Sequence, residues 1–429
     1  MSKMLWGGLG AVVVITAAGA GAKIYADKSL AAYYQQSSIS KNNYTLSYTN
    51  YQMGAVSGSA DVKFVVQRDP CDANSKMTFV GRDEIKRSWR GYEIHTALRL
   101  QNKQDKYAKL FNQPIQADTV IQWTGQVKTK VLIPKIQTEF SKLKLELDPA
   151  VIQVHSQVKD HTALIKQVEF SLPELRLFDD KGQLQIKNSL FKTNQGLNQA
   201  GLEAGFVEWK TEQIQLRMTN AAAGPILLKA LEIKSDTSLQ SSTAEMKMLF
   251  KVGQIISGND ASYQNAEFHF DFKELNRAQL EKYFKLVDQK DSSCAASKSF
   301  DADILQSLLG LFNAGFVLDS NQNKFQSKSG DLVANLNAKI MPNYVSSAES
   351  MLKMLPSLVD AKMDISFDKA LLMDVLKLQP SEKGPALNEQ QVDMTLKALE
   401  DKGQIKRDGK RIKMGMTYKF GQANFETFK

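Results

Sequence analysis

Residues 127–133 read Val-Lys-Thr-Lys-Val-Leu-Ile, a run whose apolar or β-branched side chains stand at every second position. Such alternation places one set of side chains on each face of a β-strand. The stretch therefore predicts a strand with one buried and one solvent-exposed face. Residues 143–147 repeat the pattern as Leu-Lys-Leu-Glu-Leu. The same period of two dominates from residue 44 to about residue 272, which predicts a long series of antiparallel strands.

The composition indicates how these strands are joined. The chain has 429 residues, of which 43% are apolar and 24% charged, with only 25 glycines and 10 prolines. A compact Greek-key sandwich needs many tight turns, so few glycines and prolines favour an extended, twisted sheet. We expect an α+β, β-rich fold: a long twisted antiparallel sheet with amphipathic helices packed on it, after an N-terminal membrane helix.

Amphipathic helices are expected mainly in the last third of the chain. The expected start positions are Asn276, Asp301, Ser346, Asp368 and Asn388. Each is a residue that can cap a helix before an apolar stripe of helical period. Two alternating strands, beginning at residues 267 and 362, run straight into such helices, which forms a weak internal repeat.

Three parts of the chain follow from this pattern. Residues 1–36 form the N-terminal signal-anchor and a juxtamembrane helix, and residues 37–272 form a β-rich domain. Residues 273–429 form an α+β region that completes the sheet.

The N-terminal segment predicts a membrane association. Leu5 to Ala22 is uncharged and would be roughly 27 Å long as a helix, just enough to cross a bilayer. It fits an uncleaved signal-anchor, a secretory signal cleaved after the small residues 20–22, or an ordinary core helix. Tyr33 and Tyr34 suit the headgroup level, which favours the anchor, with Lys23 onward outside the cytoplasm.

The two cysteines predict a disulfide. Cys71 and Cys294 both lie in polar, loop-like sequence, not in the apolar settings of unpaired structural cysteines. In an exported domain, two such thiols favour a Cys71–Cys294 bond, with two free thiols as the alternative. Neither has a second ligand at metal-binding spacing, so no metal site is expected.

Most classes of chemistry find no support in the sequence. No nucleotide-binding, nucleophile-elbow or zinc-protease motif occurs, so we name no catalytic, cofactor-binding or metal residue. A net charge of +9 is spread along the chain, which gives no reason to expect nucleic acid. The basic hairpin at residues 405–411 resembles the end of a winged helix, but no polar recognition helix precedes it.

Short motifs indicate a family. The stretch Tyr51-Gln-Met-Gly-Ala-Val-Ser-Gly-Ser-Ala60 follows an N-terminal apolar segment and a first strand. It resembles the tyrosine, glycine and serine motif found early in the YdgA-like family of bacterial envelope proteins, grouped as a domain of unknown function. The closing residues 416–421 are similar to that family's ending. The resemblance implies a single-pass inner-membrane protein, with its bulk in the periplasm and no assigned chemistry.

Two functions stay open. The favoured one is a non-enzymatic binding or scaffold protein of the envelope, whose sheet offers a groove or platform to a lipid, polymer or protein. The alternative is a periplasmic hydrolase whose site is assembled from scattered residues. The residues we expect to line a groove are Val131, Ile133, Leu143, Leu145, Val168 and Phe170.

Overall fold

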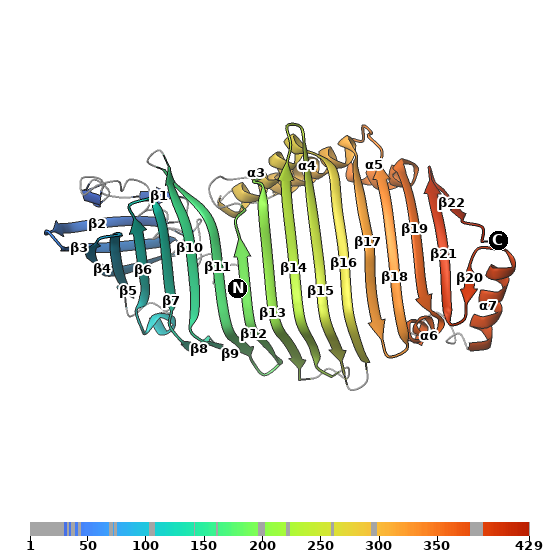
Figure 1. Ribbon diagram of the computed structural model, residues 1–429, viewed down its shortest axis with the longest axis horizontal. Coiled ribbons are helices and arrows are strands. Elements are labelled where there is room, and N and C mark those ends of the chain that lie inside the picture. Colours follow the sequence, from blue (N-terminus) through green and yellow to red (C-terminus); the bar gives the residue numbers. More distant parts are fainter. Residues whose placement is uncertain are drawn as a thin grey trace.

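A computed structural model shows one long antiparallel sheet (Figure 1). It describes residues 30–428 except 32–33, 36–38, 42–43, 68–71, 73–74, 103–107, 141, 160–161, 196–201, 220–223, 259–260, 293–297 and 378–388. The expected membrane segment and both cysteines therefore lie outside the described residues. The β-rich fold with a long antiparallel sheet is confirmed.

The first ten strands build an N-terminal unit with a closed core. They are β1 (Ile39–Lys41), β2 (Tyr44–Met53), β3 (Ser57–Gln67), β4 (Lys76–Ser88), β5 (Gly91–Leu100), β6 (Ile115–Gln122), β7 (Gln126–Ile133), β8 (Ile136–Phe140), β9 (Leu143–Leu147) and β10 (Ala150–Lys159). A 3₁₀ helix, Ala108–Phe111, lies between β5 and β6. Inward side chains such as Phe64, Tyr92 and Val131 are almost wholly buried, because alternation gives this face mostly apolar residues.

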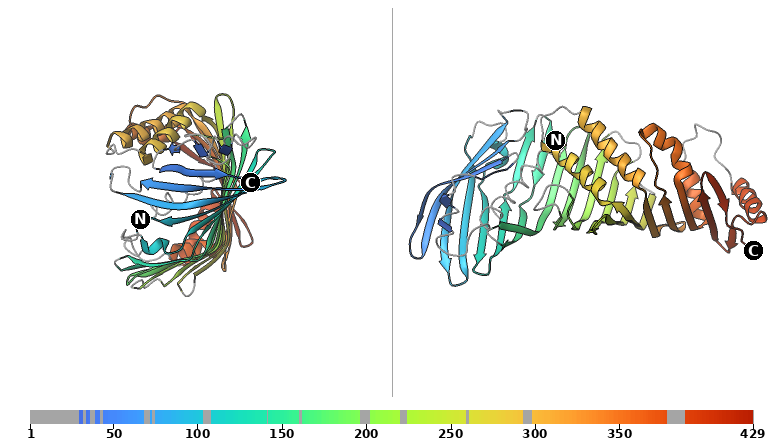
Figure 2. Two further views of the ribbon diagram at one scale, coloured as in Figure 1. Left: turned by 90° about the vertical axis from the view of Figure 1, so that its left-hand side faces the viewer. Right: turned by 90° about the horizontal axis from the view of Figure 1, so that it is seen from above.

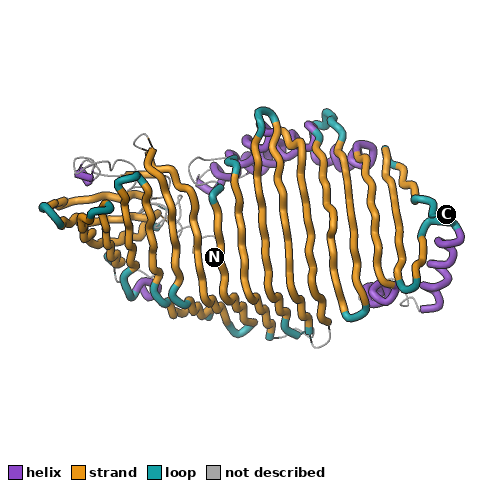
Figure 3. The backbone as a smooth tube through the Cα atoms, viewed as in Figure 1, coloured by secondary structure: helices purple, strands orange, loops and turns teal. Residues whose placement is uncertain are grey.

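The remaining strands lie side by side in an array along the long axis (Figure 3). They are β11 (Thr162–Phe178), β12 (Gly182–Thr193), β13 (Gly205–Met218), β14 (Ile226–Leu239), β15 (Thr243–Ser257), β16 (Ala261–Asn276), β17 (Phe316–Ser327), β18 (Gly330–Ile340), β19 (Val359–Asp368), β20 (Lys406–Asp408), β21 (Arg411–Lys419) and β22 (Gln422–Phe425). From β10 to β19 each strand pairs with the next in sequence, and β21 follows β19. The chain therefore adds strands in order, through direct connections up to β16 and through helical segments after β16, β18 and β19.

Five helices accompany the array in the part of the chain that the structure describes. They are α3 (Arg277–Ser292), α4 (Lys298–Ala314), α5 (Ala348–Leu358), α6 (Lys369–Lys377) and α7 (Glu389–Asp401). The expected cap of α3 is confirmed, since the Gln279 amide donates to Asn276 Oδ1 at 3.1 Å. The strand-to-helix repeat is also present, as β16 leads into α3 and β19 into α6. Among the described residues, no helix combines the length and apolar composition needed to cross a bilayer.

Two helix boundaries differ from expectation. The first helix residue of α4 is Lys298, before Asp301, and the cap of α5 is Ser347, whose hydroxyl accepts the Ser350 amide at 3.1 Å. Neighbouring Ser346 lacks this contact with the helix start, so it lies just outside. Pro356 lies inside α5 without ending it, and the helix continues to Leu358.

The sheet is curved, and α3 and α4 lie on its concave side (Figure 2). Leu280 of α3 and Leu311 of α4 pack with Ala244 and Leu275 of the sheet below them. These contacts cover one end of β15 and β16. At the far end of the array, α7 packs against β21 through Leu396 and neighbouring apolar residues.

A line of irregular residues, which we call the seam, crosses six neighbouring strands. At the seam, the residue of each strand is missing from the regular pairing with its facing residue on the next strand. Three of these residues have positive φ: Asn188 at 49°, Ala230 at 51° and Asn265 at 50°. From β11 to β16, the seam residues are Pro173, Asn188, Glu212, Ala230, Gly253 and Asn265. Left-handed backbone interrupts the strict alternation of a strand.

The apolar positions of each strand shift by one residue at the seam. On β11, apolar side chains stand at residues 170 and 172 before the seam and at 175 and 177 after it. All four pack against the same core, so the shift keeps one face apolar along the whole strand. Without it, each long strand would turn its second apolar half toward water.

The opposite face of the array has alternating charges. The Lys192 ammonium lies 2.9 Å from the Glu169 carboxylate, and Lys210 lies 2.9 Å from Glu208. Lys234 approaches Glu208 from the other side at 3.3 Å. Such partly exposed pairs contribute at most about 1 kcal/mol each, so they favour solubility and register more than stability.

Candidate binding surface

One face of β11–β16 is mostly apolar, and we call two of its rows, between which the polar residues Ser189 and Thr211 lie, the open apolar face. The first row, one residue per strand, is Phe170, Phe191, Trp209, Ile233, Phe250 and Phe268. The second row is Leu175, Ile186, Ile214, Leu228, Ile255 and Tyr263. The rows lie on either side of the seam, and both owe their shared face to the shift described above.

These side chains are incompletely covered. Phe170 borders the closed core and is buried, while the other eleven residues of the open apolar face keep part of their surface in solvent. Phe268 is 37% exposed, and beyond the second row Ile226 reaches 42% and Met218 61%. Val131, in the closed core of the N-terminal unit, is 0% exposed. The same kind of alternating strand therefore has a closed core in the N-terminal unit and an open one here.

The apolar character continues toward the C-terminus. On β18, β19 and β21, the partly buried residues Leu336, Met363 and Met416 stand in register. A polar break precedes them on β17, where the buried Ser320 hydroxyl donates to the His269 carbonyl and the Asn323 amide donates to Ser320. At about 4.8 Å spacing, the six strands of the open apolar face span roughly 24 Å, and the ten strands from β11 to β21 span roughly 43 Å with the polar break between them.

The six residues expected to line a groove lie at or before the start of this face. Val131, Ile133 and Leu145 are buried in the closed core, and Leu143 is partly buried on β9. Val168 and Phe170 lie on β11, where the closed core meets the open apolar face.

Whether any of the six touches a ligand stays a prediction. Eleven of the twelve residues of the open apolar face were missed by the sequence reasoning. The sequence signal for them is the one-residue shift of the apolar positions, which occurs in all six strands. It becomes visible only when the strands are aligned by their pairing.

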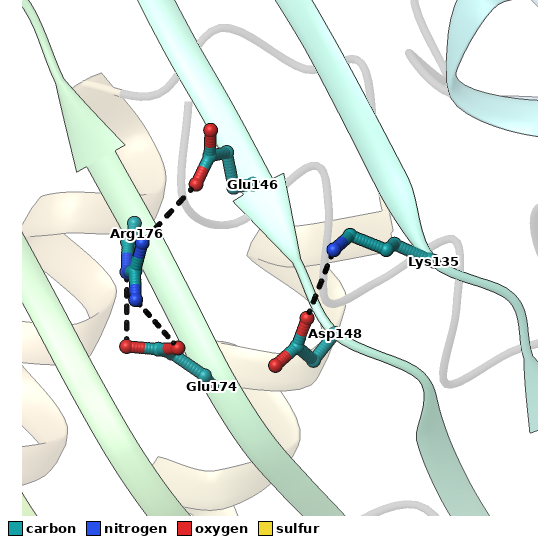
Figure 4. Close-up of a pocket in the computed structure, with 5 residues that line it drawn as sticks. All are labelled: Lys135, Glu146, Asp148, Glu174 and Arg176. Carbon is teal, nitrogen blue, oxygen red and sulfur yellow. Dashed lines mark hydrogen bonds and ion pairs between the residues drawn. The ribbon is translucent and has the colours of Figure 1, made fainter.

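A shallow pocket on the sheet holds five charged residues that face one another (Figure 4). The Arg176 guanidinium donates twice to the Glu174 carboxylate, at 2.9 Å each, and lies 3.6 Å from Glu146. Lys135 lies 3.6 Å from Asp148. Burial acts to raise the pKa of Glu174, but hydrogen bonds from Arg176 and Gln185 outweigh it and lower that pKa. Each of these charged groups has a partner of opposite charge within the pocket, as is typical of a network that stabilises structure.

Among the residues that the structure describes, the titratable groups form no catalytic constellation. The ring contacts of His95 and His269 are with the carboxylates of Asp118 and Glu267, at 2.7 and 3.0 Å, and not with a nucleophile. Within the described ranges, no group of three or more His, Cys, Asp or Glu side chains could hold a metal ion. Burial raises the pKa of Asp83 to about 6, but this carboxyl lies inside the N-terminal core, away from solvent.

Comparison with known proteins gives a family and nothing finer. No curated protein and no solved structure matches the chain. One family model, described as "Bacterial protein of unknown function (DUF945)", matches residues 1–426. The match confirms that the motifs indicated a bacterial family of unknown function, whereas the YdgA-like name stays a resemblance.

Proposed function

Because this chain belongs to the DUF945 family of bacterial proteins of unknown function, we propose its role from the geometry of the sheet. It is a non-enzymatic envelope protein that binds a linear aliphatic chain, such as a lipid acyl chain, along its open apolar face. The observation that carries the proposal is the partial exposure of eleven apolar side chains in two continuous rows. Large contiguous apolar surfaces of this kind are typical of interaction sites.

The shape of the face favours a long and unbranched ligand. The apolar rows run across six strands, roughly 24 Å at about 4.8 Å per strand, before the polar break on β17. A compact polar ligand would need convergent hydrogen-bonding groups to fix its orientation. An aliphatic chain needs none, and each methylene that it buries contributes about 0.8 kcal/mol.

The proposed location is the inner membrane, crossed once, with residues from Lys23 onward in the periplasm. It is supported by the uncharged run Leu5–Ala22 and by the bacterial family. Alkaline phosphatase fused after Lys429 should be active in cells. An inactive fusion, or a mature chain released from the membrane and starting at Lys23, would contradict the anchor.

The Cys71–Cys294 disulfide is proposed with this location, because the periplasm is oxidising. Peptide mapping without reductant should recover the two cysteines in one linked peptide. Recovery of either cysteine in alkylated form from native protein would contradict the bond.

Mass spectrometry of lipids extracted from the purified full chain tests the ligand. We expect acyl-containing species with the wild type and their loss with Ile214→Asp, since a buried carboxylate would have to be desolvated beneath the chain. Gln213→Asp is the matched control, because its side chain lies on the opposite face of the same strand. Extracts free of acyl species from the wild type would refute the proposal. Turnover of acyl esters by the purified protein would instead support the hydrolase alternative.

A further inference from the structure

Three turns of the N-terminal unit bring exposed aromatic and basic side chains together, and we call this group the tip surface. It consists of Val56, Arg87, Trp89, Arg90 and Trp123. The Arg87 amide donates to the Val56 carbonyl at 2.8 Å, and the Trp123 amide donates to the Arg90 carbonyl at 3.0 Å. The three turns are thus held side by side by backbone hydrogen bonds.

The tip surface exposes residues that proteins usually cover. Trp89 is 81% exposed and Val56 67%, although indole and isopropyl groups favour burial. The Trp123 indole donates to the Trp89 carbonyl at 2.9 Å, which fixes its orientation. The Arg90 guanidinium lies 4.3 Å from the centre of the Trp89 ring. The group is therefore organised, not a set of loose side chains.

We propose that the tip surface docks onto an anionic phospholipid surface. Tryptophan prefers the headgroup level of a bilayer, where its ring meets apolar matter and its N–H meets water. Arginines beside it pair with lipid phosphates, and each basic group near an anionic leaflet is worth about 1 kcal/mol. The N-terminal unit also forms one end of the long axis (Figure 1), which suits end-on contact with a membrane.

The length of the chain before the N-terminal unit also points to a lipid partner, an argument that rests on the proposed membrane anchor. The uncharged run ends at Ala22, and Leu30 is wholly buried in the closed core. Eight residues span at most about 28 Å, so an anchored chain holds the N-terminal unit close to the bilayer. Tyr34 strengthens this attachment, because its hydroxyl donates to the buried Asp83 carboxylate at 2.8 Å.

Tryptophan fluorescence of the full chain in vesicles with brominated acyl chains tests the docking, since bromine quenches indoles that reach the lipid. The difference in emission between wild type and Trp89→Phe isolates the Trp89 signal. We expect this signal to lose most of its intensity in anionic brominated vesicles, relative to the same vesicles without bromine. Replacing both Arg87 and Arg90 by Gln should restore most of it.

A matched control uses an exposed aromatic position elsewhere. Tyr344, fully exposed in the segment before α5, becomes a reporter in Tyr344→Trp, and its added emission should stay unquenched. If the chain sediments with the vesicles but the Trp89 signal is as bright with bromine as without, the docking is refuted while the anchor stands. If the chain does not sediment, both the anchor and the docking fail. Neither result alters the acyl-extraction test of the open apolar face.

Discussion

Asp83 is a carboxyl group enclosed by the N-terminal core, with 4% of its surface exposed. The hydroxyls of Tyr34 and Thr96 donate to its two oxygens, at 2.8 and 2.6 Å. Burial is the largest influence on this group and raises its pKa from 3.8 to about 6, against the lowering effect of the two hydrogen bonds and of His95. The protonated carboxyl is therefore favoured by the folded state.

This shift predicts a pH dependence of stability. Between pH 4 and 6 the folded chain binds more protons at Asp83 than the unfolded chain, so stability falls as pH rises through that window. About two pKa units correspond to a loss of roughly 3 kcal/mol. Urea midpoints of wild type and Asp83→Asn, compared from pH 4 to 7, should diverge in this window, with the variant lacking the decline. Parallel pH profiles would contradict the assignment to Asp83.

Ala230 has a backbone conformation that suits glycine better, with φ of 51° in the middle of β14. Ala230→Gly removes the clash of Cβ in the left-handed region, so we expect it to raise the free energy of unfolding by about 0.5–1 kcal/mol. Ala338→Gly on β18 is the control, because its φ is negative and its methyl group is buried, so that change should destabilise. Chemical denaturation followed by circular dichroism measures both, and equal destabilisation would contradict the strain at Ala230.

At the scale of the strand, the same alternating pattern forms two different environments. Val131 on β7 faces the closed core, whereas Ile214 on β13 faces the open apolar face. Val131→Asp should lower the free energy of unfolding by about 3–5 kcal/mol, because it buries an unpaired carboxylate. Ile214→Asp should lower it by about 1 kcal/mol or less, since its carboxylate can stay hydrated. Thermal unfolding of both variants measures the two losses of stability. A similar large loss at both positions would show that the open apolar face is covered.

Individual strands and helix starts were largely predictable from the sequence. The period of two at Val127–Ile133 defines β7, and the Asn276 cap defines the start of α3, because both signals are local. The seam was not predicted, since each strand taken alone shows only a lapse of alternation. Pro173 and Ala230 become meaningful once pairing places them in one line across the sheet.

At the scale of the whole molecule, the N-terminal unit and the array differ in how they bury their apolar residues. The N-terminal unit has a closed core, and β12–β16 depend on neighbouring strands and a partial cover by α3 and α4. We expect the array to open at lower urea concentration than the N-terminal unit. Hydrogen exchange by mass spectrometry should show β3–β7 peptides still protected when β12–β16 peptides exchange. Simultaneous exchange of both regions would contradict this order.

The candidate binding surface lies where the sheet is incompletely covered. No single stretch of sequence reveals which part of the sheet is covered and which is not. Alternation predicts that Val131 and Ile214 each lie on the apolar face of a strand. It does not predict which helix or strand covers that face. The cover is decided by contacts between distant parts of the chain, such as Leu311 of α4 over Leu275 of β16. The six residues expected to line a groove therefore lie in the closed core or at its border, whereas most of the open apolar face was not predicted.

The order of the strands makes the array extensible. From β11 to β16 every strand pairs with its successor in sequence and carries one residue of the seam, so the array consists of similar units. Adding one hairpin that carries a seam residue in each strand would lengthen the apolar face by two strand widths, roughly 10 Å, without a new topology. The length of the apolar face can therefore change through the number of hairpins, without a change at either end of the sheet.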